Sequence, residues 1–229
     1  MSPQRSLKPT PRTRRATPAD DGPSASERAY AHIRARLFDG TFTGNMMLSE
    51  GDIAEELAIS RTPVHEALLR CEFEGHIRLY PKRGALVLPV SAKEIQDVLV
   101  TRRLIEVHAA DLAAQSRELG PGLLAQVDTQ ADLLHRELDE EFSTADDAFH
   151  KQIIQATGNG LLDRAYAMAR DVPLRVGNSN LRRHPERVAQ LIAEHRAIAQ
   201  AIADGDPAAA RAAVEHHLDM AMKSLLRAI

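Results

Sequence analysis

The pattern of the sequence changes near residue 92, and this change restricts the folds open to the chain. Before it, three short segments with helical spacing of apolar residues are followed by two short β-type runs, 77–80 and 85–90. After it, the segments are long, rich in Ala and Leu, and without a strand pattern. A chain of 229 residues can form two separate cores. We therefore predict a mainly α protein in which a small mixed domain precedes an antiparallel all-α bundle.

The N-terminal domain is predicted to span residues 25–90 and to fold as a winged helix-turn-helix. Its second helix follows Ser49, which is suited to cap it. Its third helix is predicted to be capped by Ser60, carries Pro63 in the first turn and ends at Gly75. The two β-type runs then form a hairpin through the turn sequence PKRG. Three short helices followed by a hairpin predict the winged fold.

Charge is distributed unevenly along the chain. Residues 1–90 carry a net charge of +2, and residues 91–229 carry −5. Residues 1–24 are predicted to form a disordered basic tail, because their charges are interleaved with Pro, Ser and Thr. This tail either contacts DNA phosphates without sequence preference or is a solvated leader with no role. Its basic residues are Arg5, Lys8, Arg12, Arg14 and Arg15.

The start of the third helix and the tip of the hairpin carry side chains suited to DNA binding. In a helix-turn-helix, the first residues of the recognition helix reach base edges and phosphates in the major groove. Arg is the commonest specific reader of guanine. The alternative is an amphipathic helix whose outer face is polar and has no partner. The candidate DNA contacts are Ser60, Arg61, Thr62 and His65 on the helix, and Lys82, Arg83 and Gly84 on the wing.

The C-terminal domain, residues 91–229, has an arginine on an apolar helix face. At about 100° per residue, Arg102 lies in the same stripe as Leu99 and Ile105. A buried guanidinium needs an anionic partner. That partner is either Glu106, one turn later, or the carboxylate of a bound ligand.

Four side chains of the C-terminal domain are predicted to hold a divalent metal ion. Asp146 and His150 lie one turn apart on one helix face, a spacing that lets both bind one ion. His195 lies in the centre of an apolar stripe, and His217 flanks the stripe of the last helix. These two histidines are 10 and 11 residues from the turn at Gly205 and Asp206, or about 15 and 16 Å at ~1.5 Å per residue. They therefore reach the same level of the bundle.

The sequence of the N-terminal domain resembles that of GntR-type transcriptional regulators. The resemblance covers about residues 25–90 and is carried by AISRTPVHEALLRCEFEGHIRLYPKRGALV. Two positions depart from the family pattern: position 65, usually Arg, is His, and Gly51 replaces a residue that is often basic. The resemblance implies that the DNA contacts fall on Arg61, Thr62, His65, Arg83 and Gly84.

The C-terminal domain resembles the FCD effector domain of the FadR-type branch of this family, over residues 93–229. The stretches TRRLIE, DDAFHKQIIQATGN and EHRAIAQAIADGDPAAARAAVEHHL carry the resemblance. It implies the smaller, six-helix form of the domain, with Arg102 near the carboxylate of an effector. A site rich in imidazole favours Zn²⁺ or Ni²⁺, with Mn²⁺ also compatible. The implied metal ligands are Asp146, His150, His195 and His217.

These features predict a DNA-binding transcriptional regulator. We expect a repressor of a metabolic operon that binds operator DNA as a homodimer and responds to a small organic acid held by the metal and Arg102. Two other functions remain open. The Asp and His site could activate water in a metal-dependent hydrolase, or the metal could be structural in a constitutive DNA binder.

The sequence also indicates where the protein acts. The single cysteine, Cys71, lies in an apolar helical stripe and is not expected to be reactive. No segment reaches the ~18 consecutive apolar residues of a membrane span, and the first residues lack the apolar run of a signal peptide. We expect a soluble cytoplasmic protein that has no membrane partner.

Overall fold

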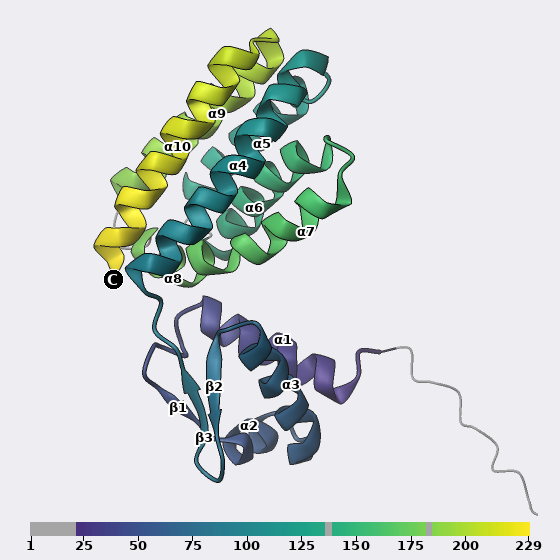
Figure 1. The fold of residues 1–229 in the computed structure, drawn as a ribbon, viewed down its shortest axis with the longest axis vertical. Helices are drawn as coiled ribbons and strands as arrows, with labels where there is room; N and C mark the ends of the chain where they lie inside the picture. The colour runs from purple at the N-terminus through teal and green to yellow at the C-terminus, as the bar shows by residue number, and fades with distance from the viewer. Residues whose placement is uncertain (1–21, 136–138, 182–184) are drawn as a thin grey trace, which may run out of the picture.

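The computed structural model describes residues 22–135, 139–181 and 185–229 (Figure 1). The chain is mainly helical, and a small antiparallel sheet occurs only in the N-terminal part of the described residues. The predicted fold class is therefore confirmed. The basic residues of the predicted tail lie outside the described residues. Two large hydrophobic cores form, one from residues 29–87 and one from residues 95–225, and a small third cluster contains Phe142, Val188 and Leu191.

The N-terminal part contains three helices and a three-stranded sheet. The elements in chain order are α1 (Ala25–Phe38), β1 (Met47–Leu48), α2 (Glu50–Glu56), α3 (Arg61–Phe73), β2 (Ile77–Tyr80) and β3 (Gly84–Val87). Strand β3 lies in the middle of the sheet and pairs antiparallel with both neighbours. The sequence pattern missed β1, because two residues are too few to show an alternation.

The helix caps agree with the sequence prediction at Ser49 and disagree at Ser60. Ser49 accepts a hydrogen bond from the backbone N–H of Asp52. Ser60 occupies the N-cap position of α3, but its side chain makes no capping hydrogen bond. A capping side chain bonds the N–H of the second or third helical residue. The third helical residue is Pro63, which has no N–H to donate, so only the N–H of Thr62 is left as a partner, and that bond is not formed.

Gly84 has a packing role at the end of the wing. Its φ of +103° is rarely adopted by residues with a side chain, and a Cβ atom there would lie 2.2 Å from the carbonyl oxygen of Leu48. The close pairing of β3 with β1 therefore requires glycine. The predicted role of Gly84 in approaching DNA is separate from this requirement and stays a prediction.

The C-terminal part is a bundle of seven helices in the described residues, where we expected six. The additional break falls at Arg170, between α7 and α8. Pro173 follows in the first turn of α8 and has no N–H to bond the carbonyl group of Ala169, so one continuous helix cannot form. The helices are α4 (Ala92–Ser116), α5 (Gly120–His135), α6 (Asp139–Gln155), α7 (Gly160–Ala169), α8 (Asp171–Leu181), α9 (Pro185–Asp204) and α10 (Pro207–Ala228).

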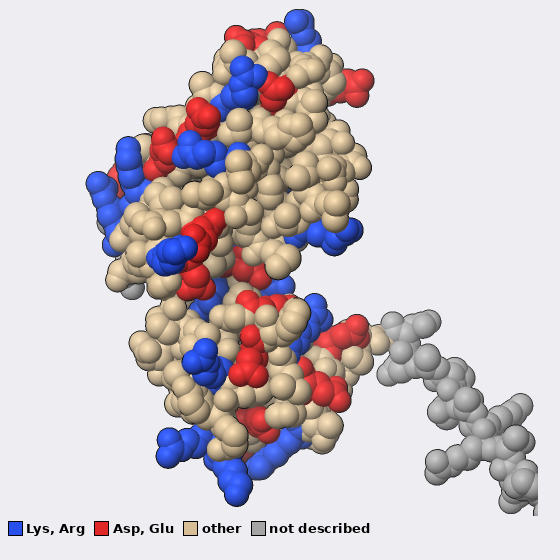
Figure 2. All heavy atoms as spheres, in the orientation of Figure 1, with Lys and Arg blue, Asp and Glu red and all other residues tan. Residues whose placement is uncertain are grey.

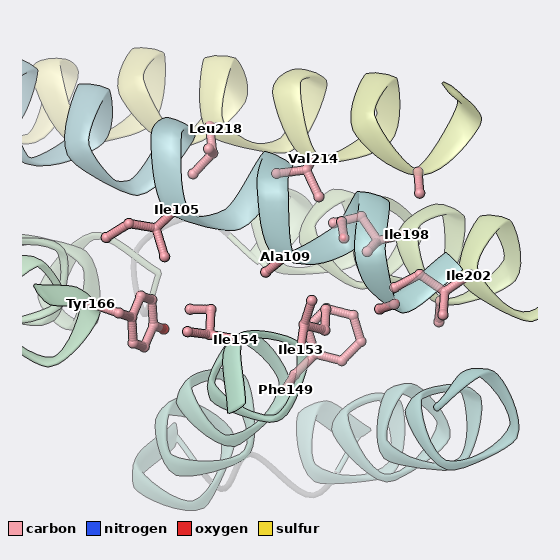
Figure 3. Packing of buried hydrophobic residues seen from close by; sticks show 14 of the residues in the cluster. Ile105, Ala109, Phe149, Ile153, Ile154, Tyr166, Ile198, Ile202, Val214 and Leu218 are labelled. Carbon is pink, nitrogen blue, oxygen red and sulfur yellow. The ribbon is translucent and has the colours of Figure 1, made fainter. Parts of the chain in front are cut away.

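Apolar side chains from α4, α6, α9 and α10 fill the centre of the bundle (Figure 3). Phe149, Ile198 and Leu218 are almost completely buried there. Helices α4 and α10 lie side by side along their length (Figure 1). The turn between α9 and α10 forms as the sequence indicates, with Asp206 capping α10 and Pro207 as its first residue. None of the described helices is long and apolar enough to cross a membrane.

Candidate DNA interface and candidate metal centre

The start of α3, the start of α2 and the wing border one surface groove. Arg61 and His65 line it from α3, and Lys82, Arg83 and Gly84 line it from the wing. Lys and Arg side chains gather at the lower end of the molecule (Figure 2), where Figure 1 shows the loop between β2 and β3. Ser60 and Thr62 are exposed at the start of α3, outside the lining of the groove.

Two contacts inside the groove were not indicated by the sequence. The Nδ1 atom of His65 lies 2.8 Å from the Oε1 atom of Glu50 at the start of α2. A Cβ atom at Gly51 would lie 3.2 Å from the Nη2 atom of Arg61, so glycine leaves room for this guanidinium. The two positions that depart from the family pattern, 51 and 65, therefore both contact side chains that border the groove.

Three histidines meet in the core of the bundle. Each of His150, His195 and His217 offers a nitrogen atom to a group whose ligand atoms lie within 4.8 Å of one another. Their exposed fractions are 2%, 0% and 2%. The Oδ1 atom of Asp146 lies 3.6 Å from the Nε2 atom of His195. The structure thus brings together the four residues that the helical spacing predicted.

Each of these imidazoles is held from behind by a second polar side chain. The Nδ1 atom of His150 lies 2.8 Å from Glu106, that of His195 lies 2.8 Å from Gln130, and that of His217 lies 2.9 Å from Glu194. Metal-binding histidines in proteins are generally oriented in this way. With Nδ1 engaged, the Nε2 atom is the one left for a ligand.

Three atoms at the centre find no hydrogen-bond partner among the described residues. They are Oδ1 of Asp146, Nε2 of His150 and Nε2 of His195, and all three are buried. An unsatisfied buried polar atom costs about 1–3 kcal/mol, and such a cluster calls for an explanation. Burial and the neighbouring His217 and His150 also hold the pKa of His195 well below its usual value. The neutral imidazole favoured in this way is the form that binds metals.

A cavity of about 90 Å³ opens beside two of the histidines, His150 and His217. Two of its lining residues are buried arginines, Arg102 of α4 and Arg187 of α9, with exposed fractions of 6% and 9%. The Nε atom of Arg102 donates to Glu106 at 2.5 Å. Of the two partners considered for Arg102, Glu106 is therefore present, and the guanidinium still faces the cavity. The remaining lining residues are Phe142, Ser143, Asp146, His150, Pro173, Leu174, Leu191, His217, Ala221, Ser224 and Leu225.

The ion pair between Arg102 and Glu106 is strongly coupled. Burial alone would raise the pKa of Glu106, but the charge of Arg102, followed by that of His150, lowers it below its usual value. Burial likewise opposes the charge on Arg102, and Glu106 raises the pKa of this guanidinium. Both groups are charged in the folded protein, because the charge of each one stabilises the charged form of the other.

Helix α8 lies between the cavity and the N-terminal part. Its residues Pro173 and Leu174 line the cavity. Asp171, at the start of the same helix, accepts a hydrogen bond from Arg34 of α1 at 2.6 Å and lies 3.3 Å from the Nε2 atom of His76. One helix thus contacts both the cavity and the N-terminal part.

A second residue of α8 adds to this contact. Arg175 donates from Nη2 to the carbonyl oxygen of Leu88 at 2.6 Å, and its Nη1 atom lies 3.5 Å from the Nδ1 atom of His76. His76 is therefore held between Asp171 and Arg175. Burial lowers the pKa of Arg175 from its usual value, while Glu94 and Asp171 raise it in part.

Comparison with known proteins identifies the two parts of the chain. Residues 25–87 match the model of the bacterial regulatory proteins of the gntR family, and residues 97–220 match that of the FCD domain. The chain belongs to the gntR family of bacterial regulatory proteins. As a member of this family it is a transcriptional regulator and not an enzyme, which removes the hydrolase alternative.

Two relatives of this GntR regulator are transcriptional regulators of other bacteria. It is 30% identical over 191 residues to an HTH-type transcriptional regulator in an unstable DNA locus of Streptomyces ambofaciens, covering 82% of this chain and 80% of that protein. It is 31% identical over 135 residues to the gluconate operon transcriptional repressor of Bacillus subtilis, covering 58% of this chain and 55% of the repressor.

The fold of this GntR regulator also occurs in solved structures. A GntR transcriptional regulator from Rhodococcus sp. RHA1 superposes with a TM-score of 0.74 at 23% identity, covering 89% of this chain and 98% of that one. McbR/YncC of E. coli superposes with a TM-score of 0.69 at 19% identity, covering 90% and 99%. At these identities the likeness supports the fold alone.

Sequence reasoning missed the residues that support the histidines, although the signal was present. Gln130 follows Leu123 and Val127 at helical spacing, and Glu194 lies between Leu191 and Ile198 at helical spacing. The same rule that singled out Arg102 as a polar residue on an apolar face therefore also finds both. What the rule cannot give is their partners, because these lie on other helices.

The buried pair gives a prediction about stability. Replacing Glu106 with Ala leaves the buried guanidinium of Arg102 without its partner, and breaking such a pair costs about 3–5 kcal/mol of folding free energy. Asp128→Ala is the matched control, because Asp128 pairs with Arg196 on the surface, where the loss should be about 1 kcal/mol or less. Urea denaturation in the presence of a chelator measures both, and equal losses would contradict the assignment.

Proposed function

We propose that this regulator is a repressor whose affinity for operator DNA is set by a small organic acid bound in the FCD domain beside a divalent metal. The single observation that carries the proposal is the position of α8. Its residues Pro173 and Leu174 line the cavity, while Asp171 and Arg175 bond to the DNA-binding part. A repressor is the favoured form of regulator because two matched relatives are gluconate operon repressors.

The metal would be held by Asp146, His150, His195 and His217. The three orphaned buried atoms and the lowered pKa of His195 fit a cation, and the imidazole-rich set favours Zn²⁺ or Ni²⁺, with Mn²⁺ compatible. A bound metal supplies a Lewis-acidic position for the carboxylate of the effector. Arg102 lines the cavity near these residues and would contribute a second positive charge.

Coupling between the acid and DNA requires that the acid bind one arrangement of the protein better than another. A ligand in the cavity contacts α8 from one side. The other side of α8 holds Arg34, His76 and the backbone of Leu88 by hydrogen bonds. A small displacement of α8 therefore changes the position of the DNA-binding part relative to the FCD domain.

Operator DNA would occupy the groove between α3 and the wing. Arg61 and His65 enter the major groove together with the exposed hydroxyls of Ser60 and Thr62. Lys82, Arg83 and Gly84 of the wing approach the phosphate backbone. Since the Nδ1 atom of His65 is engaged by Glu50, its Nε2 atom is the one that reaches DNA.

The regulator would bind two half-sites as a homodimer. Val100 and Leu104, one turn apart on α4, are 56% and 74% exposed. A groove between α4 and α10 continues this apolar surface, with Leu104, Val107 and the paired Asp111 and Arg211 on its walls. An exposed apolar patch with a polar rim is typical of an interface, and a two-fold axis lets the same patch meet its copy.

The metal prediction uses two neighbouring histidines. Adding Zn²⁺ or Ni²⁺ to metal-stripped protein should raise the Tm, with about 2.7 kcal/mol of stabilisation at a free metal concentration of 100 times the Kd. His217→Ala should lose most of this rise. His216→Ala should keep it, because His216 is exposed on the same helix. Loss of the rise in both variants, or in neither, would contradict the proposed ligand set.

The coupling prediction uses Asp171. In wild-type protein, one of a panel of small carboxylates should change the affinity for DNA upstream of its own gene. In Asp171→Ala the acid should still bind, while its effect on DNA affinity shrinks. Asp97→Ala, which removes an exposed partner of Lys93 on α4, is the control. A wild-type protein whose DNA affinity responds to no acid would instead indicate a constitutive DNA binder with a structural metal.

The DNA prediction compares two arginines of α3. Arg61→Gln should weaken operator binding and reduce the salt dependence by about one phosphate contact, or relax the preference for one base pair if the contact is to guanine. Arg70→Gln is the control, because Arg70 is engaged with Glu74 and the ring of Tyr30 near the other end of α3. Fluorescence anisotropy at several salt concentrations measures both, and wild-type binding by Arg61→Gln would refute the assignment.

The dimer prediction uses Leu104. Sedimentation at micromolar concentration should show a dimer for the wild type and a monomer for Leu104→Glu, since a charge would be buried against the partner. Leu161→Glu changes another exposed leucine, on α7, and should remain dimeric. A monomeric wild type would contradict the proposed assembly.

A further inference from the structure

Two buried arginines are connected to the histidine cluster in the same way. Arg102 bonds to Glu106, which bonds to His150. In the same way, Arg187 bonds to Glu194, which bonds to His217. In both series one carboxylate joins a guanidinium to a histidine, and both guanidinium groups line one cavity. The cavity therefore carries two positively charged side chains.

Burying the guanidinium of Arg187 costs folding free energy, and the orientation of His217 by Glu194 does not require it. Glu194 already accepts a hydrogen bond from His217 at 2.9 Å, which is enough to orient that imidazole. Burying a further guanidinium costs free energy that an ion pair only partly offsets. The retention of an arginine facing the cavity therefore points to a second task.

The geometry of Arg187 leaves it able to perform such a task. Its Nη1 and Nη2 atoms donate to the two oxygen atoms of Glu194 at 2.5 and 3.0 Å. This two-point contact uses two of the five N–H groups of a guanidinium. The remaining three can donate to a ligand, and planar contact with a carboxylate is what arginine does best.

The rest of the cavity limits the size and character of the ligand. Its volume of about 90 Å³ is several times the ~10–15 Å³ that a cavity needs to hold one water molecule. This space suits a short carbon chain. Phe142, Leu174 and Leu191 provide apolar walls, and the polar lining includes the two arginines.

We propose that Arg187 recognises a second acidic group of the effector, so that the effector is a short-chain dicarboxylate. One carboxylate lies at the metal position and Arg102, and the other lies at Arg187. A ligand that reaches Arg187 contacts the start of α9. Because Arg187 bonds to Glu194, and Glu194 bonds to His217, this ligand is also connected to the histidine cluster. This inference rests on the proposed function, because it assigns the chemical class of the acid that the FCD domain binds.

Calorimetry with matched acids tests the inference without DNA. The protein is loaded with Zn²⁺, its metal content is measured before and after titration, and malonate is compared with propionate and succinate with butyrate. Each pair has the same number of carbon atoms and differs by one carboxylate. We expect at least one diacid to bind about tenfold or more tightly than its monoacid, as a charge-assisted hydrogen-bonded contact allows. Equal affinities would overturn the inference.

Variants of Arg187 assign the preference to this side chain. Arg187→Gln should remove the preference for the diacid and leave the affinity for the monoacid within about threefold, and Arg187→Lys should restore part of it. Arg196→Gln is the control, because Arg196 lies on the same helix and pairs with Asp128 at the surface. If Arg187→Gln instead loses Zn²⁺, the arginine serves only to hold Glu194, and the inference is wrong.

The outcomes separate this inference from the proposed function. Tight binding of monoacids with no preference for diacids rejects the role of Arg187 and leaves the acid sensor intact. No binding of any acid by the Zn²⁺-loaded protein rejects both. A preference for diacids that survives Arg187→Gln places the second acidic group elsewhere in the cavity and overturns the inference.

Discussion

The burial of three imidazoles beside the half-buried carboxylate of Asp146 is the constraint on which the rest of the bundle depends. Polar atoms in such a place must be paired, because each unpaired one destabilises the fold by about 1–3 kcal/mol. The Nδ1 atoms are paired by Glu106, Gln130 and Glu194. Among the described residues, Oδ1 of Asp146 and the Nε2 atoms of His150 and His195 have no hydrogen-bond partner. The proposed cation would relieve this most costly feature of the scaffold.

The same polar side chains extend from the centre to the cavity, which residues of α8 also line. Glu106 and Glu194 each join a histidine to an arginine of the cavity wall, so a ligand at either arginine is connected to the proposed metal position. Helix α8 lines one part of the cavity and bonds to Arg34, His76 and Leu88. A response to a ligand needs no long pathway here, because one helix separates the cavity from the DNA-binding part.

Helical periodicity predicted much of this arrangement. A spacing of 3.6 residues placed Arg102, His150, His195 and His217 on inward faces. The distance of His195 and His217 from the turn at Gly205 and Asp206 placed these two histidines at the same level of the bundle. Periodicity gives the face on which a side chain lies and not the atom that it contacts. The partners Gln130 and Glu194, the contact of His65 with Glu50, and the contacts of α8 with the N-terminal part all join segments that are distant in sequence.

Local chemistry explains the details that were predicted incorrectly. The hydroxyl of Ser60 cannot cap Pro63, and the described bundle has seven helices where six were expected, with a break at Arg170 just before Pro173. Strand β1 pairs over two residues, too few for a pattern. In each case the sequence contained the responsible residues, and the outcome was decided by a missing N–H group or by a pairing with a distant strand.

The central claim is that acid binding in the FCD domain and DNA binding at the winged helix are linked by one coupling free energy. Thermodynamic linkage provides the most direct measurement of this free energy. The affinity of the metal-loaded protein for the acid is measured by calorimetry with and without operator DNA, and the affinity for DNA is measured with and without the acid. We expect the two ratios to be equal and different from one, in the range of about 5- to 150-fold. An acid affinity that is unchanged by saturating operator DNA would contradict the coupling.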